Sequence, residues 1–372
     1  MELVVRKSDL LRELQFFQGI VERKTTLPVL ANVLVQAGGE SVELAATDTE
    51  VGLRSRCAAS VAKQGAVTLP AKKLYEIIKA LPETDVRIEQ DKSGVKVAAE
   101  RFESRLSTLP RDEFPQLPDA GEAVATLPRE SLKHMVEKTQ FAMTGEDTRY
   151  YLNGALFILK PEQMTLVATD GHRLALVTVP RENGDAKVSD DDEGVKVLLP
   201  RKTTLELSKL LGEGKEAIAY ERSENHLFFR VEGRTLISRM MDAQFPAYER
   251  VIPKGNDKTV TFDRERINNA VRRVALLSNE RSRAVKFQIA PGKVEVTSSS
   301  PEVGEAREEL LVDYEGAALQ ICFNAQYVLD FLGAVESDTI SLSLKDEASQ
   351  ALLKPVGVDG YDYTYVIMPM RI

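Results

Sequence analysis

The sequence has no tryptophan, only three histidines and only two cysteines among its 372 residues. Two cysteines, Cys57 and Cys322, are too few for a disulfide framework and lack the spacing of a zinc site. No apolar run approaches the roughly 20 residues that span a membrane, and residues 1–9 are too polar for a signal peptide. We therefore expect a cytoplasmic protein that contacts no membrane and holds no metal ion or other cofactor.

An excess of basic residues is also missing. The 49 lysines and arginines stand against 57 aspartates and glutamates, which gives a net charge of −8 at pH 7. This balance argues against a generally basic nucleic-acid-binding protein, but it leaves room for a local basic face. A phosphate-binding loop of the Walker type is missing too, because Gly212-Glu213-Gly214-Lys215 lacks the required frame.

What the sequence does contain is a repeated unit. Val67-Thr68-Leu69-Pro70 returns as Val197-Leu198-Leu199-Pro200, an offset of 200 − 70 = 130 residues, and Phe114-Pro115 returns as Phe245-Pro246, an offset of 245 − 114 = 131. A third copy begins at Val260-Thr261-Phe262-Asp263. Units of this length are domains, because solenoid repeats are much shorter. We predict three α+β domains over residues 1–120, 121–252 and 253–372, each built from two modules of a strand, a helix and further strands.

Apolar residues at helical spacing, such as Leu10 and Phe17 in the first helix, predict the helices of these modules. Basic residues fall on the expected polar faces in every repeat; in the central repeat they are Arg129, Lys133 and Lys138. A solvated helix face explains any one such set. Recurrence in all three copies favours a shared role, in which lysines and arginines contact DNA phosphates without reading the bases.

The stretch Val167–Ala175 has an apolar run, then Asp170-Gly171, then alternation, a pattern that predicts two strands joined by a tight turn. The same pattern stands upstream as Leu44–Val51, where no histidine is present. Because the Thr-Asp element is shared by two repeats, we interpret Asp170 as a turn former and not as an acid or a base.

Two other functions fit parts of the sequence. Asp170 and His172 have the spacing of a general-base pair in a hydrolase, but His134 and His226 have no nucleophile or metal partner nearby in the sequence. A sequence-specific DNA-binding regulator would need a recognition-helix or zinc motif, and none is found. We therefore predict a binding protein that is not an enzyme and has no catalytic residues.

The three repeats, together with Thr169–Leu174 and the ending Tyr365–Ile372, resemble the bacterial DNA polymerase III beta subunit family, the replicative sliding clamps. Arg149–Gly154 and Phe245–Val251 are similar to the same family. The resemblance implies three DNA-clamp domains in a head-to-tail homodimeric ring, with helices lining the hole and antiparallel sheets outside. It also implies a processivity factor for DNA replication, which encircles duplex DNA without regard to sequence and tethers the replicative polymerase of the DNA polymerase III holoenzyme.

The partners that the resemblance implies are the polymerase III alpha subunit, clamp-loader subunits and other proteins with short clamp-binding peptides. An apolar cleft is expected, in which methionines adapt to varied peptide side chains and Arg173 and Arg250 cap the peptide backbone. The resemblance assigns this peptide-binding pocket to Leu152, Thr169, Gly171, His172, Arg173, Leu174, Pro246, Arg250, Val251, Asn324, Tyr327, Val366, Met368, Pro369, Met370 and Arg371.

Two further surfaces are expected. Residues facing the DNA are expected to be Arg23, Lys24, Lys72, Arg149, Tyr150, Tyr151, Arg201 and Lys202. The dimer interface is expected to join the first repeat of one chain to the third repeat of its partner, through Lys73, Leu106, Leu276, Leu277, Glu305 and Glu308. In this interface the leucines form an apolar centre, and the glutamates and the lysine carry opposite charges.

Overall fold

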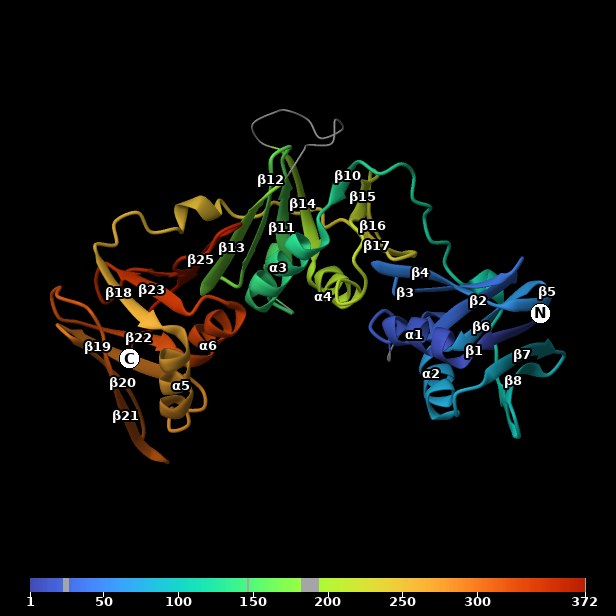
Figure 1. Ribbon diagram of the computed structural model, residues 1–372, viewed down its shortest axis with the longest axis horizontal. Coiled ribbons are helices and arrows are strands. Elements are labelled where there is room, and N and C mark those ends of the chain that lie inside the picture. The colour runs from blue at the N-terminus through green and yellow to red at the C-terminus, as the bar shows by residue number, and fades with distance from the viewer. Residues whose placement is uncertain (23–26, 146, 182–193, 372) are drawn as a thin grey trace. The chain divides into compact units, whose positions relative to one another are not determined.

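The computed structural model describes residues 1–22, 27–145, 147–181 and 194–371 (Figure 1). The same order of elements occurs three times, and we call these three passes the repeats. The first repeat runs through β1 (Glu2–Arg6), α1 (Lys7–Phe17), β2 (Asn32–Gly38), β3 (Ser41–Thr47), β4 (Val51–Ala58), β5 (Ser60–Lys63), β6 (Gly65–Pro70), α2 (Ala71–Ala80), β7 (Asp85–Asp91), β8 (Gly94–Ala99) and β9 (Phe102–Leu106).

The second repeat runs through β10 (Ala125–Leu127), α3 (Arg129–Thr139), β11 (Gly154–Leu159), β12 (Gln163–Thr169), β13 (Arg173–Pro180), β14 (Val195–Pro200), α4 (Arg201–Leu210), β15 (Ile218–Arg222), β16 (His226–Val231) and β17 (Arg234–Arg239). The third runs through β18 (Lys258–Asp263), α5 (Arg264–Ala275), β19 (Ala284–Ala290), β20 (Lys293–Ser300), β21 (Gly304–Leu311), β22 (Leu319–Asn324), α6 (Ala325–Ala334), β23 (Thr339–Leu344), β24 (Ala351–Pro355) and β25 (Asp362–Ile367). Except for the additional strand β5, the three sets correspond element by element.

Each repeat contributes two antiparallel four-stranded sets to the sheets. In the third repeat these sets are β21-β20-β19-β22 and β25-β24-β23-β18. Four of the six sets join in pairs, because β17 pairs with β4 and β13 pairs with β25. The result is two eight-stranded sheets, while the β9 end and the β21 end of the chain keep a five-stranded and a four-stranded sheet.

We call the pairings of β17 with β4 and of β13 with β25 the sheet joints. They explain why the compact units do not coincide with the repeats. One unit consists of Met1–Lys133 and Lys202–Met240, and the other of His134–Arg201 and Met241–Ile372. Each unit contains one complete eight-stranded sheet, so the second repeat is shared between the units.

The helices bury the apolar faces that their spacing predicts. In α1 the buried side chains include Leu10, Leu14 and Phe17, and α1 packs beside α2. In the other unit, α5 packs beside α6 (Figure 1). Asp263 caps α5 by accepting a hydrogen bond from the backbone N–H of Arg266 at 2.8 Å, which satisfies one of the free donors at the helix start.

Two basic residues that were expected on a polar helix face are buried instead. The Arg129 guanidinium donates to the carbonyls of Leu211 and Gly214, so it caps the carbonyl end of α4. Lys138 is 1% exposed, and its Nζ lies 4.9 Å from the ring centroid of Tyr361. The prediction for these two residues was wrong, because helical spacing marks a polar position without showing which neighbour covers it. Among the described residues, no helix is both long and apolar enough to cross a membrane.

An ion pair between Glu13 and Arg234 links α1 to the start of β17. Both side chains are almost fully buried, and Arg234 donates from Nε to Oε2 at 2.7 Å and from Nη2 to Oε1 at 2.8 Å. The Arg234 guanidinium also lies 4.4 Å from the ring centroid of Phe16. The pair therefore fixes the first repeat to the second beside the joint of β4 and β17.

We predict that Glu13→Ala lowers the free energy of unfolding by about 3–5 kcal/mol, because Arg234 loses its buried bidentate partner and keeps only the half-exposed Glu213, at 3.5 Å, as a counter-charge. Urea unfolding followed by circular dichroism measures the loss. The matched control is Asp362→Ala, which removes the partner of Lys354 from a pair whose side chains are 39% and 65% exposed. We expect that change to cost less than about 1 kcal/mol. Equal losses in the two variants would contradict the assignment.

Candidate peptide-binding groove

The turn between β12 and β13 is built by the side chain of Asp170. Its Oδ1 accepts the backbone N–H of His172 at 2.9 Å and that of Arg173 at 3.0 Å, and its Oδ2 accepts from Arg173 Nε at 3.0 Å. Thr169 closes the turn by donating from Oγ1 to the Arg173 carbonyl at 2.6 Å. The interpretation of Asp170 as a turn former is confirmed. Both carboxylate oxygens of Asp170 accept hydrogen bonds within the turn. Asp170 is therefore not free to take part in the general-base pair that the hydrolase hypothesis requires.

The end of the chain lies beside this turn, as the family resemblance implies. β13 and β25 pair antiparallel, with Arg173 opposite Ile367 and Leu174 opposite Val366. The next residues continue the contact, because the Met368 N–H donates to the His172 carbonyl at 2.9 Å. The Met370 N–H then donates to the Cys322 carbonyl of β22 at 2.8 Å. The last residues are therefore held at both ends and form a fixed wall.

A cavity of about 170 Å³ opens between this wall and the turn. Val167, Leu174 and Val366 form a buried apolar cluster, against which Phe245 and Tyr248 pack. The residues that line the cavity are Arg149, Tyr151, Leu152, Thr169, Gly171, His172, Arg173, Leu174, Pro246, Tyr248, Val251, Val366 and Met368. A small apolar cavity with a few polar groups at its rim is the form of site that holds side chains of a bound peptide.

Six residues assigned to the pocket do not line this cavity: Arg250, Asn324, Tyr327, Pro369, Met370 and Arg371. Asn324 caps α6 by accepting the Gln326 N–H at 2.9 Å. The Tyr327 ring centroid lies 4.3 Å from the Arg173 guanidinium, and the Tyr327 carbonyl accepts from the Tyr365 hydroxyl at 2.9 Å. Met370 is half-buried beside β22, while Arg250 and Arg371 are exposed. These residues lie along the same unit but outside the hollow.

Arg173 has a different role from the expected capping of a peptide backbone. Its guanidinium donates to Asp170, to Asp330 of α6 and to the Phe141 carbonyl, and its side chain is only 9% exposed. Burial alone would lower the pKa of Arg173, but Tyr365 and Asp330 outweigh burial and raise the pKa, so the group stays charged. Arg173 therefore ties the turn to α6 and supports the floor of the cavity.

Three lining residues were not assigned to the pocket from the sequence. Tyr248 stands between Pro246 and Val251, which were both assigned, so its neighbours were the available signal. Arg149 and Tyr151 were assigned to the DNA-facing surface. Arg149 donates to Asp147 from Nε at 3.0 Å and from Nη2 at 2.8 Å, and these bonds hold the pKa of Asp147 at about 2. Arg149 Nη2 also lies 3.2 Å from the Asp170 carbonyl, so it forms part of the rim.

The other residues expected to face DNA differ in how free they are. Tyr150 is 52% exposed, and Lys72 is exposed with its Nζ 3.9 Å from Glu76. Lys202 is engaged in the fold, because its Nζ pairs with Asp48 and donates to the Ile20 carbonyl at 2.9 Å. Arg201 is partly buried. Arg23 and Lys24 lie outside the described residues.

Except for Lys73 in α2, the residues expected at the dimer interface lie on or near two sheet edges, one edge in each unit. Leu106 belongs to β9, and Glu305 and Glu308 belong to β21. Leu276, just after α5, is 79% exposed, and Leu277 beside it is partly buried. Lys73 pairs with Glu76 at 2.8 Å, and Glu308 pairs with Arg273 at 2.6 Å. Leu311, at the end of β21, is 81% exposed and was not assigned to any surface from the sequence.

No group of three or more metal-ligating side chains is found among residues 1–22, 27–145, 147–181 and 194–371. His172 is exposed at the rim of the groove, where its backbone N–H and carbonyl are the groups that bond to the turn and to Met368.

Comparison with known proteins agrees along the whole chain. Models of the DNA polymerase III beta subunit match with the N-terminal domain at residues 1–118, the central domain at 126–247 and the C-terminal domain at 249–371. The beta sliding clamps of Pseudomonas putida and Escherichia coli K12 are 40% and 35% identical, with 100% of each chain covered.

Solved structures are equally similar. A Pseudomonas aeruginosa sliding clamp bound to griselimycin gives a TM-score of 0.91 at 37% identity, and a Bartonella birtlesii clamp bound to griselimycin gives 0.92 at 36%, each with 100% of both chains covered. With three matched domains, full-length relatives and the repeated fold described above, the chain belongs to the DNA polymerase III beta subunit family.

Proposed function

We propose that this protein is a sliding clamp, which encircles duplex DNA as a homodimeric ring and tethers the replicative polymerase and other partners to it. The observation that carries the proposal is the way in which the repeats join. A ring of two chains needs a strand pairing that joins one chain to the other. Within this chain, two strand pairings of the same kind already join the repeats. The chain also contains the two strands that would make a third such pairing with a partner chain.

The two internal joints use equivalent strands in the same register. In the first, Val51 lies opposite Ser238 and Gly52 opposite Ile237. In the second, Arg173 lies opposite Ile367 and Leu174 opposite Val366. Val51 and Arg173 both stand three residues after the turn aspartate of their hairpins. In each joint, the last strand of one repeat therefore pairs with the fourth strand of the repeat before it.

The strands that would make the third joint are β9, the last of the first repeat, and β21, the counterpart of β4 and β13. On the side used by the other joints, neither has a neighbour among the described strands. Such an edge is ready to pair with another chain. Pairing β9 of each chain with β21 of its partner makes two identical joints, which closes a two-fold dimer of six repeats.

Transfer of the register gives the expected alignment at the dimer joint. Ser104 corresponds to Leu236 by its position in the hairpin, and Glu305 corresponds to Leu53. Leu236 lies opposite Leu53 in the first joint, so Ser104 is expected opposite Glu305 of the partner chain. Leu106, Leu276 and Leu277 supply apolar surface beside this joint.

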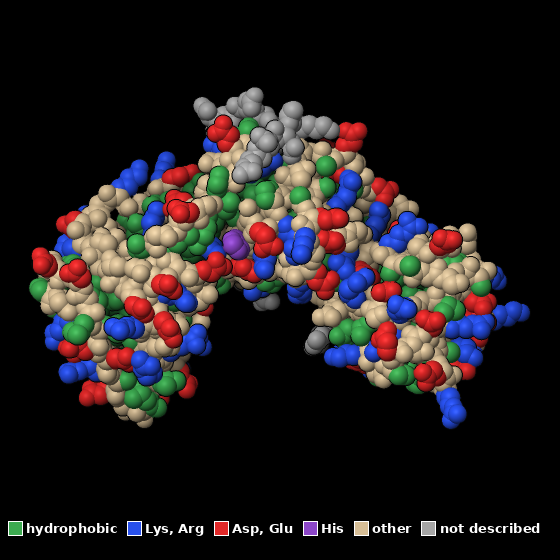
Figure 2. Space-filling view, in the orientation of Figure 1, with side chains coloured by type: hydrophobic (Ala, Val, Ile, Leu, Met, Phe, Trp, Pro, Cys, Tyr) green, Lys and Arg blue, Asp and Glu red, His purple; other side chains and the backbone are tan. Residues whose placement is uncertain are grey.

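Contact with DNA rests on few side chains. Lys and Arg are interspersed with Asp and Glu over the face seen in Figure 2, which fits loose contact with phosphates and no reading of bases. We propose Lys72, Arg149, Tyr150, Tyr151 and Arg201 as DNA-facing residues, with Arg23 and Lys24 beyond the described part. We do not propose that Lys202 faces DNA, because its ammonium group is already paired with the Asp48 carboxylate. Topology and not affinity then keeps the clamp on DNA.

The groove receives the partners. Its apolar cavity fits a short peptide with leucine or phenylalanine side chains, as expected for the polymerase alpha subunit and clamp-loader subunits, and Met368 at its rim can adapt to different peptides. The proposed peptide-binding groove keeps all the assigned residues, the six outside the cavity included, and adds Tyr248, which lines the cavity. We also propose the domain boundaries 1–120, 121–252 and 253–372 and a cytoplasmic location. None of these tasks includes a catalytic step.

The dimer joint is tested by cross-linking. We expect Ser104→Cys combined with Glu305→Cys to form a disulfide-linked dimer under mild oxidation, because directly opposed residues of paired strands lie within disulfide range. Non-reducing electrophoresis measures the yield. Ser104→Cys combined with Arg307→Cys is the matched control, since its cysteines are offset by two residues and should link poorly. An equal yield from both pairs would refute the transferred register.

Topological binding is tested on two forms of one DNA. After loading by a clamp loader, the protein should stay on a nicked circle and should be lost from the same DNA once it is cut to a linear form. A wash in high salt sharpens the comparison, because contacts to phosphates weaken steeply with salt while an encircling ring is retained. Gel filtration measures the bound fraction. Equal retention on circles and linear DNA would indicate an ordinary DNA-binding protein.

The groove is tested by truncation. Deletion of Met368–Ile372 removes much of the apolar wall, so affinity for a peptide containing Gln, Leu and Phe should fall by at least ~2 kcal/mol, roughly thirtyfold. His172→Ala should have a much smaller effect, because His172 is exposed at the rim. Calorimetric titration compares both variants with the parent, and light scattering should show that the dimer persists. Unchanged affinity after truncation would mean that the pocket is misplaced.

A further inference from the structure

A basic side chain bridges two parts of the first repeat at its joint with the second repeat. Lys202, the second residue of α4, pairs through Nζ with the Asp48 carboxylate in the turn between β3 and β4. The same Nζ donates to the carbonyl of Ile20, just after α1, at 2.9 Å. The Asp48 side chain is 4% exposed, and Ile20 is fully buried. We call a basic group that reaches both the turn and the carbonyl after the first helix the lock of a joint.

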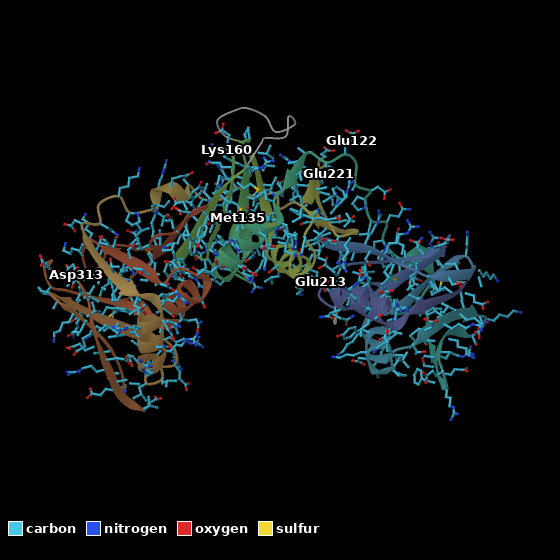
Figure 3. All side chains as sticks on the ribbon, viewed as in Figure 1. Glu122, Met135, Lys160, Glu213, Glu221 and Asp313 are labelled. Carbon is cyan, nitrogen blue, oxygen red and sulfur yellow. The ribbon has the colours of Figure 1, made fainter. Side chains whose placement is uncertain are left out.

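The joint of β13 and β25 has a lock of the same form. The Arg173 guanidinium donates from Nε to the turn residue Asp170 at 3.0 Å and from Nη2 to the carbonyl of Phe141 at 2.5 Å. Phe141 follows α3, the helix that carries Met135 in Figure 3. Arg173 belongs to β13, but its pair with Asp330 ties it to α6, the second helix of the next repeat. Both internal joints therefore place a positive charge between a turn carboxylate and a carbonyl after a helix.

The basic group of a third lock stands on α2. Lys72 corresponds to Lys202, because each is the second residue of a ten-residue helix that begins directly after the proline at the end of a strand. The Lys72 side chain is 59% exposed, and its Nζ lies 3.9 Å from Glu76. Glu76 pairs more closely with Lys73, at 2.8 Å. The ammonium group of Lys72 is therefore available to a partner chain.

The third repeat supplies the carbonyl. Leu277 corresponds to Ile20, because both follow the first helix of their repeat with the same backbone bond. The Ile20 N–H donates to the Phe17 carbonyl at 3.1 Å, and the Leu277 N–H donates to the Val274 carbonyl at 3.2 Å. Ile20 is fully buried, whereas Leu277 is only partly buried in the single chain. This difference agrees with a joint that needs a second chain to cover it.

The turn between β20 and β21 supplies the carboxylate. It comprises residues 301–303, one residue fewer than the turn of Asp48, because Ser300 pairs directly with Gly304. Its acid is Glu302, which is exposed and has a side chain one methylene longer than that of an aspartate. The register proposed for the dimer joint brings this turn beside α2 of the partner chain, as the turn of Asp48 lies beside α4.

One contact must differ between the joints. Glu206 of α4 lies so close to Gly19 that a Cβ on this glycine would have no room. The third repeat has Leu276 in the place of Gly19, and Glu76 of α2, which corresponds to Glu206, is 44% exposed where Glu206 is 7% exposed. Glu76 therefore does not take the buried position of Glu206. A leucine side chain meets α2 instead, which agrees with the apolar surface proposed beside the dimer joint.

We propose that Lys72 is the lock of the dimer joint, where it pairs with Glu302 and donates to the Leu277 carbonyl of the partner chain. The inference rests on the dimer proposed above, and it gives Lys72 a task that needs no DNA. Lys72 and Glu302 are exposed in the separate chain and meet only when the ring closes. Salt therefore weakens this lock more than the buried locks inside the chain. The ring has two such locks, one at each dimer joint.

Reversal of one charge tests the lock in the absence of DNA. Lys72→Glu should raise the dissociation constant of the dimer at least about tenfold, because two carboxylates then face each other at each joint. Glu302→Lys should have the same effect, and sedimentation equilibrium measures both. Lys63→Glu is the matched control. It makes the same change of charge at an exposed position of β5, at the opposite edge of the sheet from β9, and should leave the dissociation constant unchanged.

Mixing the two variants gives a sharper test. Each variant alone has like charges at both joints of its dimer. In a dimer of one Lys72→Glu chain and one Glu302→Lys chain, one joint carries both substitutions and the other carries neither, so opposite charges face each other at both. Mixed dimers should therefore form well above the half that random exchange gives. Native mass spectrometry measures the fractions.

The outcomes separate this inference from the function on which it rests. A monomeric parent protein would contradict the proposed dimer itself. A dimeric parent whose dissociation constant is unchanged by Lys72→Glu would overturn the lock and leave Lys72 only its contact with DNA. Random mixing of the two variants would show that Lys72 meets a group other than Glu302, and that result would also overturn the proposal.

Discussion

Backbone pairing between the last strand of one repeat and the fourth strand of the preceding repeat is the interaction on which this structure depends. It turns separate four-stranded sets into eight-stranded sheets, and it places the Asp170 turn beside the last residues of the chain. Hydrogen bonds of this kind carry no sequence requirement, so one joint can be made by strands as different as Val51–Ala58 and Arg173–Pro180. Side chains then decide what each joint does: the first holds a buried ion pair, the second a groove.

The sequence predicted those parts of the fold that depend on residues close together in the chain. Repeated motifs and the spacing of apolar residues predicted the helices, and Asp170-Gly171 predicted the hairpin of β12 and β13. The sheet joints have no such signal, because pairing between β13 and β25 depends on strands almost 200 residues apart. For the same reason the compact units, which follow the joints, could not be read from the repeats.

The residues of the candidate site were predicted from the family resemblance more than from residue chemistry. Comparing the expected surroundings of these side chains with those in the structure shows which kinds of residue can be predicted. Leu174 and Val366 line the cavity because they lie opposite each other across the joint of β13 and β25, and Leu152 reaches it from the turn before β11. Arg173, Arg129 and Lys138 have long basic side chains whose surroundings come from distant segments, such as Asp330 on α6. A charge at a polar position can therefore support the interior as readily as it can meet a ligand, and only the tertiary structure separates the two.

The interleaved make-up of the compact units constrains the order in which the protein can fold during synthesis. β4 ends at residue 58, and its partner β17 starts 234 − 58 = 176 positions later, at residue 234. At ribosomal rates of about 5–20 residues per second, the β4 edge waits roughly 9 to 35 seconds for that partner. The other unit waits for the end of the chain, since β25 supplies the strand beside β13. A nascent chain thus carries an open strand edge for most of its synthesis, and chaperone capture would act in that interval.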